Sequence, residues 1–275
     1  NGSDTSARAF DKRGAMRRFL AAAACATLAA CTFQGGGLAP FNPAPIAPAE
    51  RDLDVPYVPT PRPVVAAMLD MAELGPDDYL IDLGSGDGRI AIEAARRGAR
   101  ALGVDIDPNR VREAIAAAQL AGVEARARFR RQDLFDTPIR EASVVSMYLL
   151  PAINLRLRPR LLTDLRPGTR IVSHAFNMGD WAPDEHREVN AANIYLWIVP
   201  AVAGGRWLLS DAGGERVLIL EQRFQEVSGT LGGAALSEVT LRGTRFRFTA
   251  AGRSYEGEID GAAMRGEGWS ARRVE

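Results

Sequence analysis

The residues that can do chemistry begin with an acid and three glycines at alternate positions. Asp82 lies two residues before Gly84, and Gly86 and Gly88 complete the series. A dinucleotide site uses the spacing Gly-x-Gly-x-x-Gly, and a Walker loop ends in Gly-Lys followed by Ser or Thr. Neither spacing occurs at this turn. An acid beside the turn disfavours a phosphate and favours a cation, so the pattern predicts a backbone that closely approaches a small cationic ligand.

Two further acids follow the next apolar runs. Asp105 comes 17 residues after Gly88, and in nucleoside-binding α/β folds an acid at the end of the second strand accepts the ribose hydroxyls. Its alternative role, a cap on the next helix, suits Asp107 better because a proline follows it. Asp133 is the candidate for an adenine amino group, or else a turn acid. The predicted ligand-binding residues are Tyr57, Thr60, Asp82, Gly84, Ser85, Gly86, Asp87, Gly88, Asp105, Ile106, Asp133 and Leu134.

The elements that must position these residues alternate between apolar runs and helical patterns. Strands are predicted over residues 79–81, 101–105, 125–132, 142–150 and 169–173. Helices are predicted over residues 64–74, 89–97, 109–121 and 155–165, the last capped by Asn154. Five strand-then-helix units in a row indicate an α/β fold with a doubly wound parallel sheet. Ligands of such sheets bind at the carboxyl ends of the strands, which brings the three acids to one edge.

The end of the fourth predicted strand carries the candidate catalytic residue, Tyr148. Leu149, Leu150 and Pro151 follow it, at the edge where a second substrate would meet the ligand. The alternative is that the tyrosine packs under the next helix. His174, at the exposed end of the fifth predicted strand, is expected to be a structural histidine.

A stiff segment precedes the first predicted helix. Residues 55–61 contain three prolines, which favour an extended backbone. We expect this segment to form a lid in which Tyr57 and Thr60 touch the ligand. The alternative is a rigid entry into the helix.

Composition limits the other function classes. The chain has 275 residues, with 34 basic and 34 acidic side chains, so no overall field attracts nucleic acid and no nucleic-acid partner is predicted. Lys12 is the only lysine in the sequence. The two cysteines, Cys25 and Cys31, and two histidines predict neither a disulfide framework nor a metal site.

The front of the chain has the pattern of a targeting segment. Arg17 and Arg18 precede a short apolar run that ends at Cys31 in a sequence like a bacterial lipobox. Residues 1–31 are therefore predicted to be a signal, and residues 32–54, rich in Gly and Pro, a linker. This pattern predicts an exported bacterial lipoprotein, attached to a membrane through Cys31. If the segment is only an Ala-rich terminus, a cytoplasmic protein is expected.

The end of the chain has a different pattern. From about residue 213 to residue 275, short strands alternate with glycines, as in hairpins. Phe246 and Phe248 lie on one face of the run 244–249, and arginines lie on the other. A small antiparallel sheet or partial barrel is predicted, with the arginines on a solvated face rather than on nucleic acid.

Residues 82–88 resemble motif I of the class I, seven-strand, Rossmann-like methyltransferases. Residues 56 to about 197 resemble the lysine methyltransferases of the ATP synthase c-subunit and the adenine nucleotide translocase, together with their bacterial relatives. The matching pieces are residues 55–59, 82–90 and 181–184. The resemblance implies that residues 55–212 form a methyltransferase domain that binds S-adenosylmethionine, whose ammonium and sulfonium suit an acid beside the turn. The lipobox-like front and the extra C-terminal part depart from the family pattern.

The resemblance further implies N-methylation of a protein lysine. An ammonium must lose its proton before it accepts a methyl group, and an apolar pocket at Leu149, Leu150 and Pro151 favours that loss. Two alternatives remain. One is a small-molecule methyltransferase on the same fold. The other is a membrane-anchored nucleoside-binding protein without catalysis, which would explain an exported chain in a compartment where S-adenosylmethionine is not normally supplied.

Overall fold

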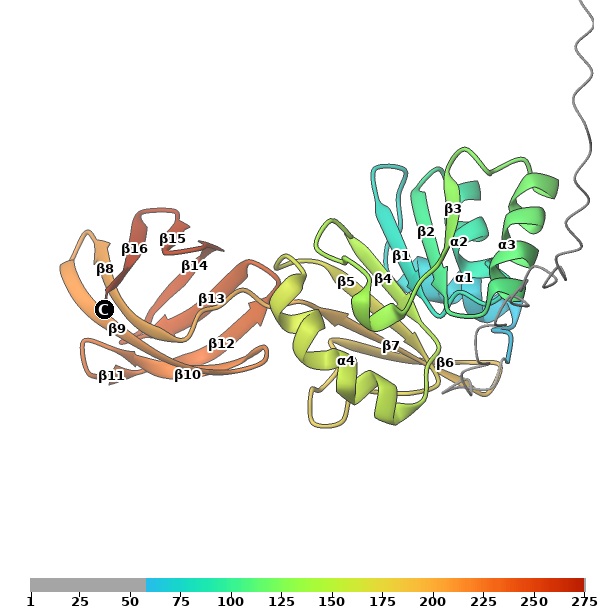
Figure 1. Cartoon of the computed structure of the whole chain (residues 1–275). Coiled ribbons are helices and arrows are strands. Elements are labelled where there is room, and N and C mark those ends of the chain that lie inside the picture. The colour runs from blue at the N-terminus through green and yellow to red at the C-terminus, as the bar shows by residue number, and fades with distance from the viewer. Residues whose placement is uncertain (1–57, 275) are drawn as a thin grey trace, which may run out of the picture. The chain divides into compact units, whose positions relative to one another are not determined.

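The computed structural model describes residues 58–274. The predictions for Tyr57, for the signal with Cys31 and for the linker at residues 32–54 lie outside the described residues. Within them the first sheet has seven strands in the order β3-β2-β1-β4-β5-β7-β6 (Figure 1). The strands are β1 (Tyr79–Leu83), β2 (Arg100–Asp105), β3 (Ala127–Arg131), β4 (Val144–Met147), β5 (Arg170–His174), β6 (Glu185–Val189) and β7 (Ala192–Ile198). The helices are α1 (Arg62–Met71), α2 (Arg89–Arg96), α3 (Pro108–Leu120), α4 (Pro151–Asp164) and the 3₁₀ helix η1 (Leu134–Asp136).

The first five strands are parallel to one another. Their apolar side chains are buried on both faces, as in sheets that helices cover on two sides. On one face Leu80 and Val144 pack with α1 and α2. On the other face Ile81 and Val145 pack with α4, and Figure 1 shows these two helical layers. The predicted doubly wound sheet is confirmed.

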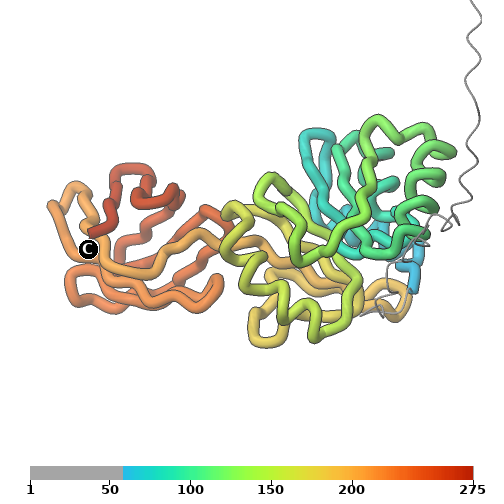
Figure 2. The backbone as a smooth tube through the Cα atoms, in the orientation of Figure 1, coloured from blue at the N-terminus to red at the C-terminus, as the bar shows by residue number. Residues whose placement is uncertain are grey.

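The prediction of five strand-then-helix units was wrong. An α-helix follows β1, β2 and β4, but only the short η1 follows β3, and this direct path can be followed in Figure 2. β5 leads into the β6–β7 hairpin, in which β7 is antiparallel to both β5 and β6. The last two strands therefore extend the sheet without crossover helices.

The start of α4 also differs from the prediction. The helix begins at Pro151, and Asn154 lies inside it rather than at its cap. Proline suits the first helical position, because the N–H that it lacks would have no partner within the helix. The Asn154 side chain is buried, and its Nδ2 lies 3.3 Å from the carbonyl oxygens of Phe176 and Asn177. Asn154 thus fixes the segment that follows β5.

The second sheet is the antiparallel sheet that was predicted for the C-terminal part of the chain. Its nine antiparallel strands have the order β11-β10-β9-β8-β16-β15-β14-β13-β12, and β10 also contacts β12. β8 lies within this sheet, which therefore begins at residue 205, before the expected domain boundary of 213. The strands are β8 (Gly205–Asp211), β9 (Gly214–Arg223), β10 (Glu226–Leu231), β11 (Ala234–Ala235), β12 (Ser237–Arg242), β13 (Arg245–Ala250), β14 (Arg253–Asp260), β15 (Ala263–Gly266) and β16 (Trp269–Val274).

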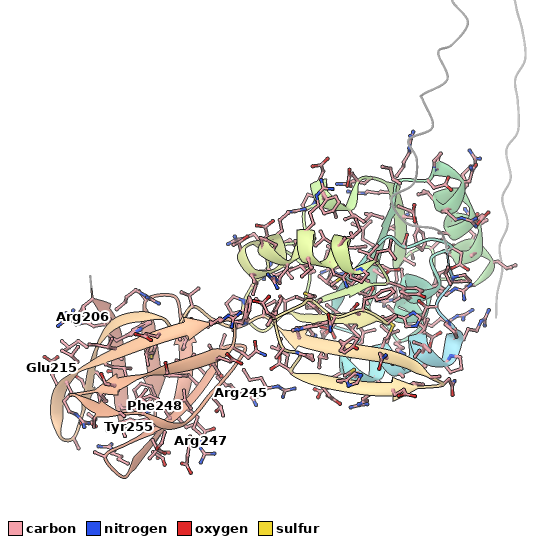
Figure 3. All side chains as sticks on the ribbon, turned by 90° about the horizontal axis from the view of Figure 1, so that it is seen from below. Arg206, Glu215, Arg245, Arg247, Phe248 and Tyr255 are labelled. Atoms are coloured by element: carbon pink, nitrogen blue, oxygen red, sulfur yellow. The ribbon has the colours of Figure 1, made fainter. Side chains whose placement is uncertain are left out.

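The two faces of β13 differ as the alternating sequence predicted. Phe246 and Phe248 are buried, and Arg245 and Arg247 are exposed. Figure 3 labels Phe248 and the two arginines on this strand. The Phe248 ring stacks on Tyr255 of β14 at a centroid distance of 4.8 Å. Burial of such aromatic pairs forms the core of this sheet.

Among the described residues of the chain, no helix has the length and apolar character needed to cross a membrane.

Gly88 is predicted to be the most sensitive glycine of the turn. Its φ is +80°, and an added Cβ would lie 2.6 Å from the Phe129 ring and 2.8 Å from the Ala114 Cβ. Gly88→Ala should therefore cost about 3 kcal/mol of unfolding free energy, from backbone strain and overpacking together. Gly122 is the matched control, because its φ is +67° and nothing lies within 4 Å of its added Cβ. Gly122→Ala should cost about 1 kcal/mol. Chemical denaturation compares the two, and equal losses would contradict the packing argument.

Candidate functional site

The glycine-rich turn rests on the end of β2. The amides of Gly84 and Ser85 both donate to the Val104 carbonyl oxygen, each at 2.9 Å. Gly84, Gly86 and Gly88 have φ values of +78°, +52° and +80°, a region that glycine adopts without steric cost. The turn therefore contains three positions whose backbone conformation suits glycine best. It leads directly into the N-terminus of α2.

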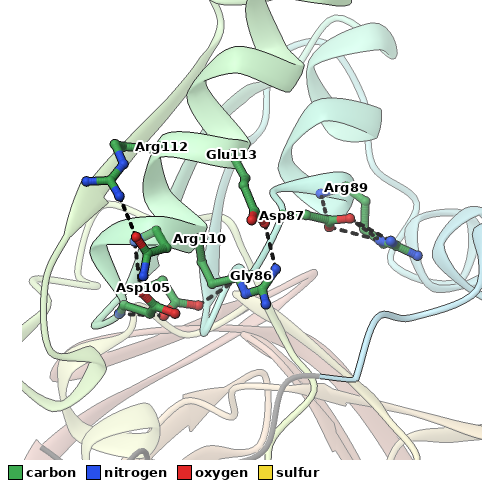
Figure 4. A network of polar contacts seen from close by, with 9 residues as sticks. Gly86, Asp87, Arg89, Asp105, Arg110, Arg112 and Glu113 are labelled. Carbon is green, nitrogen blue, oxygen red and sulfur yellow. Dashed lines mark hydrogen bonds and ion pairs between the residues drawn. The ribbon is translucent and has the colours of Figure 1, made fainter. Parts of the chain in front are cut away.

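Asp105 joins this turn to the start of α3. Its Oδ2 accepts a hydrogen bond from the Gly86 amide at 2.8 Å, and its Oδ1 accepts one from the Asp107 amide at 2.9 Å. Asp107 caps α3 by accepting from the Asn109 amide at 2.8 Å, as predicted. Figure 4 shows the Asp105 carboxylate between the turn and α3. A carboxylate has about four acceptor positions, so Asp105 can accept two more hydrogen bonds.

Asp82 is a buried acid with one unpaired oxygen. Its Oδ1 accepts from the Ser146 hydroxyl at 2.8 Å, while its Oδ2 is buried without a hydrogen-bond partner among the described residues. Burial raises the pKa of Asp82 to about 7; Asp105 and Asp87 add to the rise, and the Ser146 hydrogen bond opposes it. A buried polar atom without a partner is costly, and a cationic group at this oxygen would remove that cost.

Asp87 binds the arginine that holds the predicted lid. Its Oδ1 accepts from Arg89 Nε at 2.9 Å, and the two side chains form an ion pair (Figure 4). The same guanidinium donates through Nη1 to the Thr60 carbonyl oxygen at 2.8 Å. The segment 58–61 is thereby fixed to the first turn of α2.

Thr60 also reaches the end of β5. Its hydroxyl lies 3.1 Å from His174 Nδ1, and the imidazole centroid lies 3.9 Å from that of Tyr148. The expectation of an exposed His174 was wrong, because the residue is 5% exposed. Burial lowers the pKa of His174, so the ring is neutral at pH 7. Tyr148 and His174 meet because Met147 and Ser173 are in register on neighbouring strands.

Asp133 and Leu134 follow β3 at the same edge. The Asp133 Oδ1 accepts from the Phe135 amide at 2.8 Å and caps η1. The Gln132 amide donates to the Asp105 carbonyl oxygen at 2.9 Å, which joins this segment to the end of β2. Asp133, Leu134, Asp105 and Ile106 are all half-buried. The three predicted acids therefore lie at the carboxyl ends of three adjacent strands.

Two polar partners in this site were missed from the sequence. Ser146 hydrogen-bonds Asp82 across neighbouring strands, and Arg89 joins the glycine turn to the lid. Ser146 carried a signal, because it is the polar exception in an otherwise apolar strand. Arg89 looked like an ordinary solvent-facing residue of α2.

Comparison with known proteins identifies the family. The profile of the ANTKMT methyltransferase domain matches residues 82–185. A protein-lysine N-methyltransferase of Saccharolobus islandicus (strain REY15A) is 44% identical over 151 residues, which cover 53% of this chain and 94% of that protein. The chain belongs to this methyltransferase family. It is a class I methyltransferase with S-adenosylmethionine as its cofactor.

Two further relatives are informative. The crystal structure of an RNA methyltransferase from Salinibacter ruber, in complex with S-adenosyl-L-homocysteine, is 51% identical with a TM-score of 0.51. It covers 52% of this methyltransferase, which covers 94% of it. The adenine nucleotide translocase lysine N-methyltransferase of Mus musculus is 36% identical over 132 residues, which cover 48% of this chain and 57% of that protein. The profile match ends before β8, so it does not include the nine-stranded sheet.

Proposed function

We propose that this methyltransferase transfers a methyl group from S-adenosylmethionine to the side-chain nitrogen of a protein lysine. The observation that supports it most is the 44% identity to a protein-lysine N-methyltransferase of which the chain covers 94%. The site agrees with that chemistry, because its carboxyl edge combines acids for a cationic cofactor with an apolar segment for an amine acceptor.

The cofactor is proposed to lie across the ends of β1, β2 and β3. Asp105 would accept the ribose hydroxyls with the acceptor positions that its two backbone hydrogen bonds leave open. Asp82 would face the ammonium of the methionine part through its unpaired Oδ2, and Thr60 would lie beside it. Asp133, Leu134 and Ile106 would surround the adenine. An added Cβ at Gly84 would lie 2.9 Å from the Leu149 side chain. The backbone of the turn thus lies close to the segment that we propose for the acceptor.

The acceptor is proposed to arrive at the end of β4. Leu149 is buried and Leu150 is 36% exposed, and we propose that these apolar residues after Tyr148 form the acceptor mouth. Apolar surroundings lower the pKa of an entering lysine and favour its uncharged, nucleophilic form. The bound cofactor supplies a methyl group on a sulfonium, and in-line displacement by the amine depends on positioning by the chain.

The test is transfer of isotope-labelled methyl groups to two acceptor mixtures. Heat-treated total protein from a bacterial lysate and total RNA from the same cells are incubated separately with the full chain and labelled S-adenosylmethionine. Hydrolysis of the protein should release labelled methyl-lysine. The Asp105→Ala variant is the matched control and should release none above background.

Methylation of RNA is the second candidate function. It is favoured by one observation, the 51% identity to a solved structure described as an RNA methyltransferase. Labelled nucleosides from the RNA arm, without labelled lysine from the protein arm, would support this candidate and contradict the lysine proposal. Label in neither arm would favour a nucleoside-binding protein or a small-molecule acceptor.

Tyr148→Phe should slow methyl transfer and leave cofactor binding unchanged. The substitution keeps the ring against His174 and removes the hydroxyl that we propose orients the acceptor nitrogen. Loss of one hydrogen bond at the reacting nitrogen should lower the rate about tenfold, while the Kd of S-adenosylmethionine stays within about twofold. Tyr195→Phe is the control. Tyr195 lies on β7, and its ring stacks on that of His186 at a centroid distance of 4.7 Å. A tenfold loss in the control as well would contradict a specific role for Tyr148.

We also propose that the chain is attached to a membrane through Cys31. The support is the sequence pattern alone, since residues 1–31 lie outside the described part of the structure. In a bacterial host that processes lipoproteins, the wild-type chain should be recovered with membranes, and Cys31→Ser should move most of it to the soluble fraction. Equal recovery of both chains with membranes would contradict lipidation at this cysteine.

A further inference from the structure

His174 is a buried polar side chain that the proposed cofactor and acceptor contacts do not use. Its Nδ1 faces the Thr60 hydroxyl at 3.1 Å, and its ring lies 3.9 Å from the Tyr148 ring between centroids. Among the described residues, no other hydrogen bond of the imidazole is found. The ring therefore joins the lid, which is fixed to the glycine turn, to the tyrosine at the acceptor mouth.

The backbone after His174 is strained. Ala175 has a φ of +65°, and the Phe176 amide donates back to the His174 carbonyl oxygen at 2.8 Å. This is a γ-turn with a positive central φ, which is rare and costly for a residue other than glycine. The Ser173 hydroxyl, at 2.7 Å, and the Asn154 amide both donate to the Phe176 carbonyl oxygen. Several contacts thus hold a strained turn in place. Strained residues held in this way are found most often at functional sites.

We propose that His174 is a positioning residue for methyl transfer, and that its uncharged imidazole holds the Tyr148 ring and the Thr60 hydroxyl beside the approach of the acceptor nitrogen. The inference rests on the proposed function. It adds a residue that would control the orientation of Tyr148 and Thr60 and the charge beside the acceptor nitrogen. Protonation would place a third cation beside the sulfonium and the entering ammonium. It would also remove the lone pair with which Nδ1 can accept from Thr60.

The surroundings of His174 make its charge state matter. The described part of the lid, residues 58–61, contains no titratable side chain, and the end of β4 contributes Tyr148. On β7 the residue in register with His174 is Ile194. The Arg89 guanidinium donates to the Thr60 carbonyl oxygen and is paired with Asp87. No carboxylate among these residues contacts the imidazole, and burial lowers its pKa, so protonation is opposed until the pH falls below its ordinary range.

The test is the ratio of wild-type to His174→Asn initial rates as a function of pH. Asparagine has a similar polar reach to Thr60, but it has no ring and does not titrate. Methyl-lysine formation on lysate protein is measured at saturating S-adenosylmethionine between about pH 5 and pH 9. The ratio should be about ten above neutral pH and should fall by about tenfold per pH unit below the pKa of His174. Ionisation of the acceptor lysine and of Asp82 affects both chains and cancels in the ratio.

His186 supplies the matched control. It is the second of the two histidines, is exposed on β6, and hydrogen-bonds Asn193 at 2.9 Å. His186→Asn should give a ratio near one at every pH. A structural role for His174 would lower the rate by the same factor at every pH, and such a flat ratio would overturn the inference. If the wild-type chain forms no methyl-lysine at any pH, the proposed function itself is wrong, which is a distinguishable result.

A direct readout of the ring completes the test. Nitrogen-edited NMR of histidine-labelled full chain should show two imidazoles, assigned with His186→Asn. We expect the His174 ring to titrate below the ordinary histidine pKa of about 6.5, and its ring signals to shift in Thr60→Val and Tyr148→Phe. Calorimetry should give a Kd for S-adenosylmethionine in His174→Asn within about threefold of wild type. An ordinary or raised pKa, or ring signals that neither substitution changes, would overturn the inference.

Discussion

Asp105→Ala should weaken S-adenosylmethionine binding at least about 100-fold while the chain stays folded. Hydrogen bonds to a charged group contribute about 1.5–3 kcal/mol each, and the two ribose hydroxyls would lose their acceptor. The substitution also leaves the Gly86 amide, now 2.8 Å from Asp105 Oδ2, without its partner. The glycine turn should therefore be less well ordered in the variant. Calorimetric titration with the cofactor measures the loss.

Asp107→Ala is the control for this substitution. Asp107 lies two residues on and caps α3 through its side chain, while its contact with Asp105 uses its backbone amide, which alanine keeps. Loss of the cap should lower the unfolding free energy by about 1 kcal/mol with little change in cofactor affinity. Unchanged affinity in Asp105→Ala would refute the ribose assignment. A loss of affinity in Asp107→Ala as large as that in Asp105→Ala would show that helix stability is responsible.

Asp82→Asn should have opposite effects on stability and on cofactor binding. Burial raises the pKa of Asp82 from 3.8 to about 7, so the native state binds a proton that the unfolded state releases between these values. The contribution of this group to stability is fully present below about pH 4 and is lost as the pH rises to about 7. Above pH 7 the wild-type chain carries the full cost of a buried charge, of order 4 kcal/mol.

Asparagine removes that cost because it does not ionise. The difference in unfolding free energy between Asp82→Asn and wild type, without cofactor, should rise from pH 4 to pH 7 and then stay constant. Binding of S-adenosylmethionine should be weaker in the variant at pH 8, since the acid opposite the ammonium is gone. Ser146→Ala is informative beside it, because loss of the 2.8 Å hydrogen bond to Oδ1 should raise the pKa of Asp82 further. A pH-independent stability difference would contradict a buried, shifted carboxyl.

The sequence predicted the parts of the site that depend on local pattern. The glycine spacing, the acid two residues before it and the cap at Asp107 are short-range features, because the side chains and backbone groups that they join are near in sequence. The apolar runs of β1, β2 and β4 predicted a buried parallel sheet because strands covered on both faces need no polar alternation.

The parts that failed depend on contacts between distant residues. His174 is buried because Thr60, more than 100 residues away, and Tyr148 cover it. Asn154 looks like a cap locally, but tertiary contacts direct its amide to the segment after β5. A helix after β3 was expected only because helices follow the neighbouring strands. No residue pattern after β3 itself indicated that the helix is absent. Pairing of β8 with β16 at the far end of the chain is likewise invisible to local pattern.

A crystal structure of the full chain with S-adenosyl-L-homocysteine tests the central claim most directly. The account predicts one nucleoside across the carboxyl ends of β1 and β2, with both ribose hydroxyls on Asp105 and the amino group facing the Asp82 carboxylate. The sulfur should point toward Tyr148 and His174. A nucleoside held elsewhere, or a ribose whose hydroxyls avoid Asp105, would contradict it.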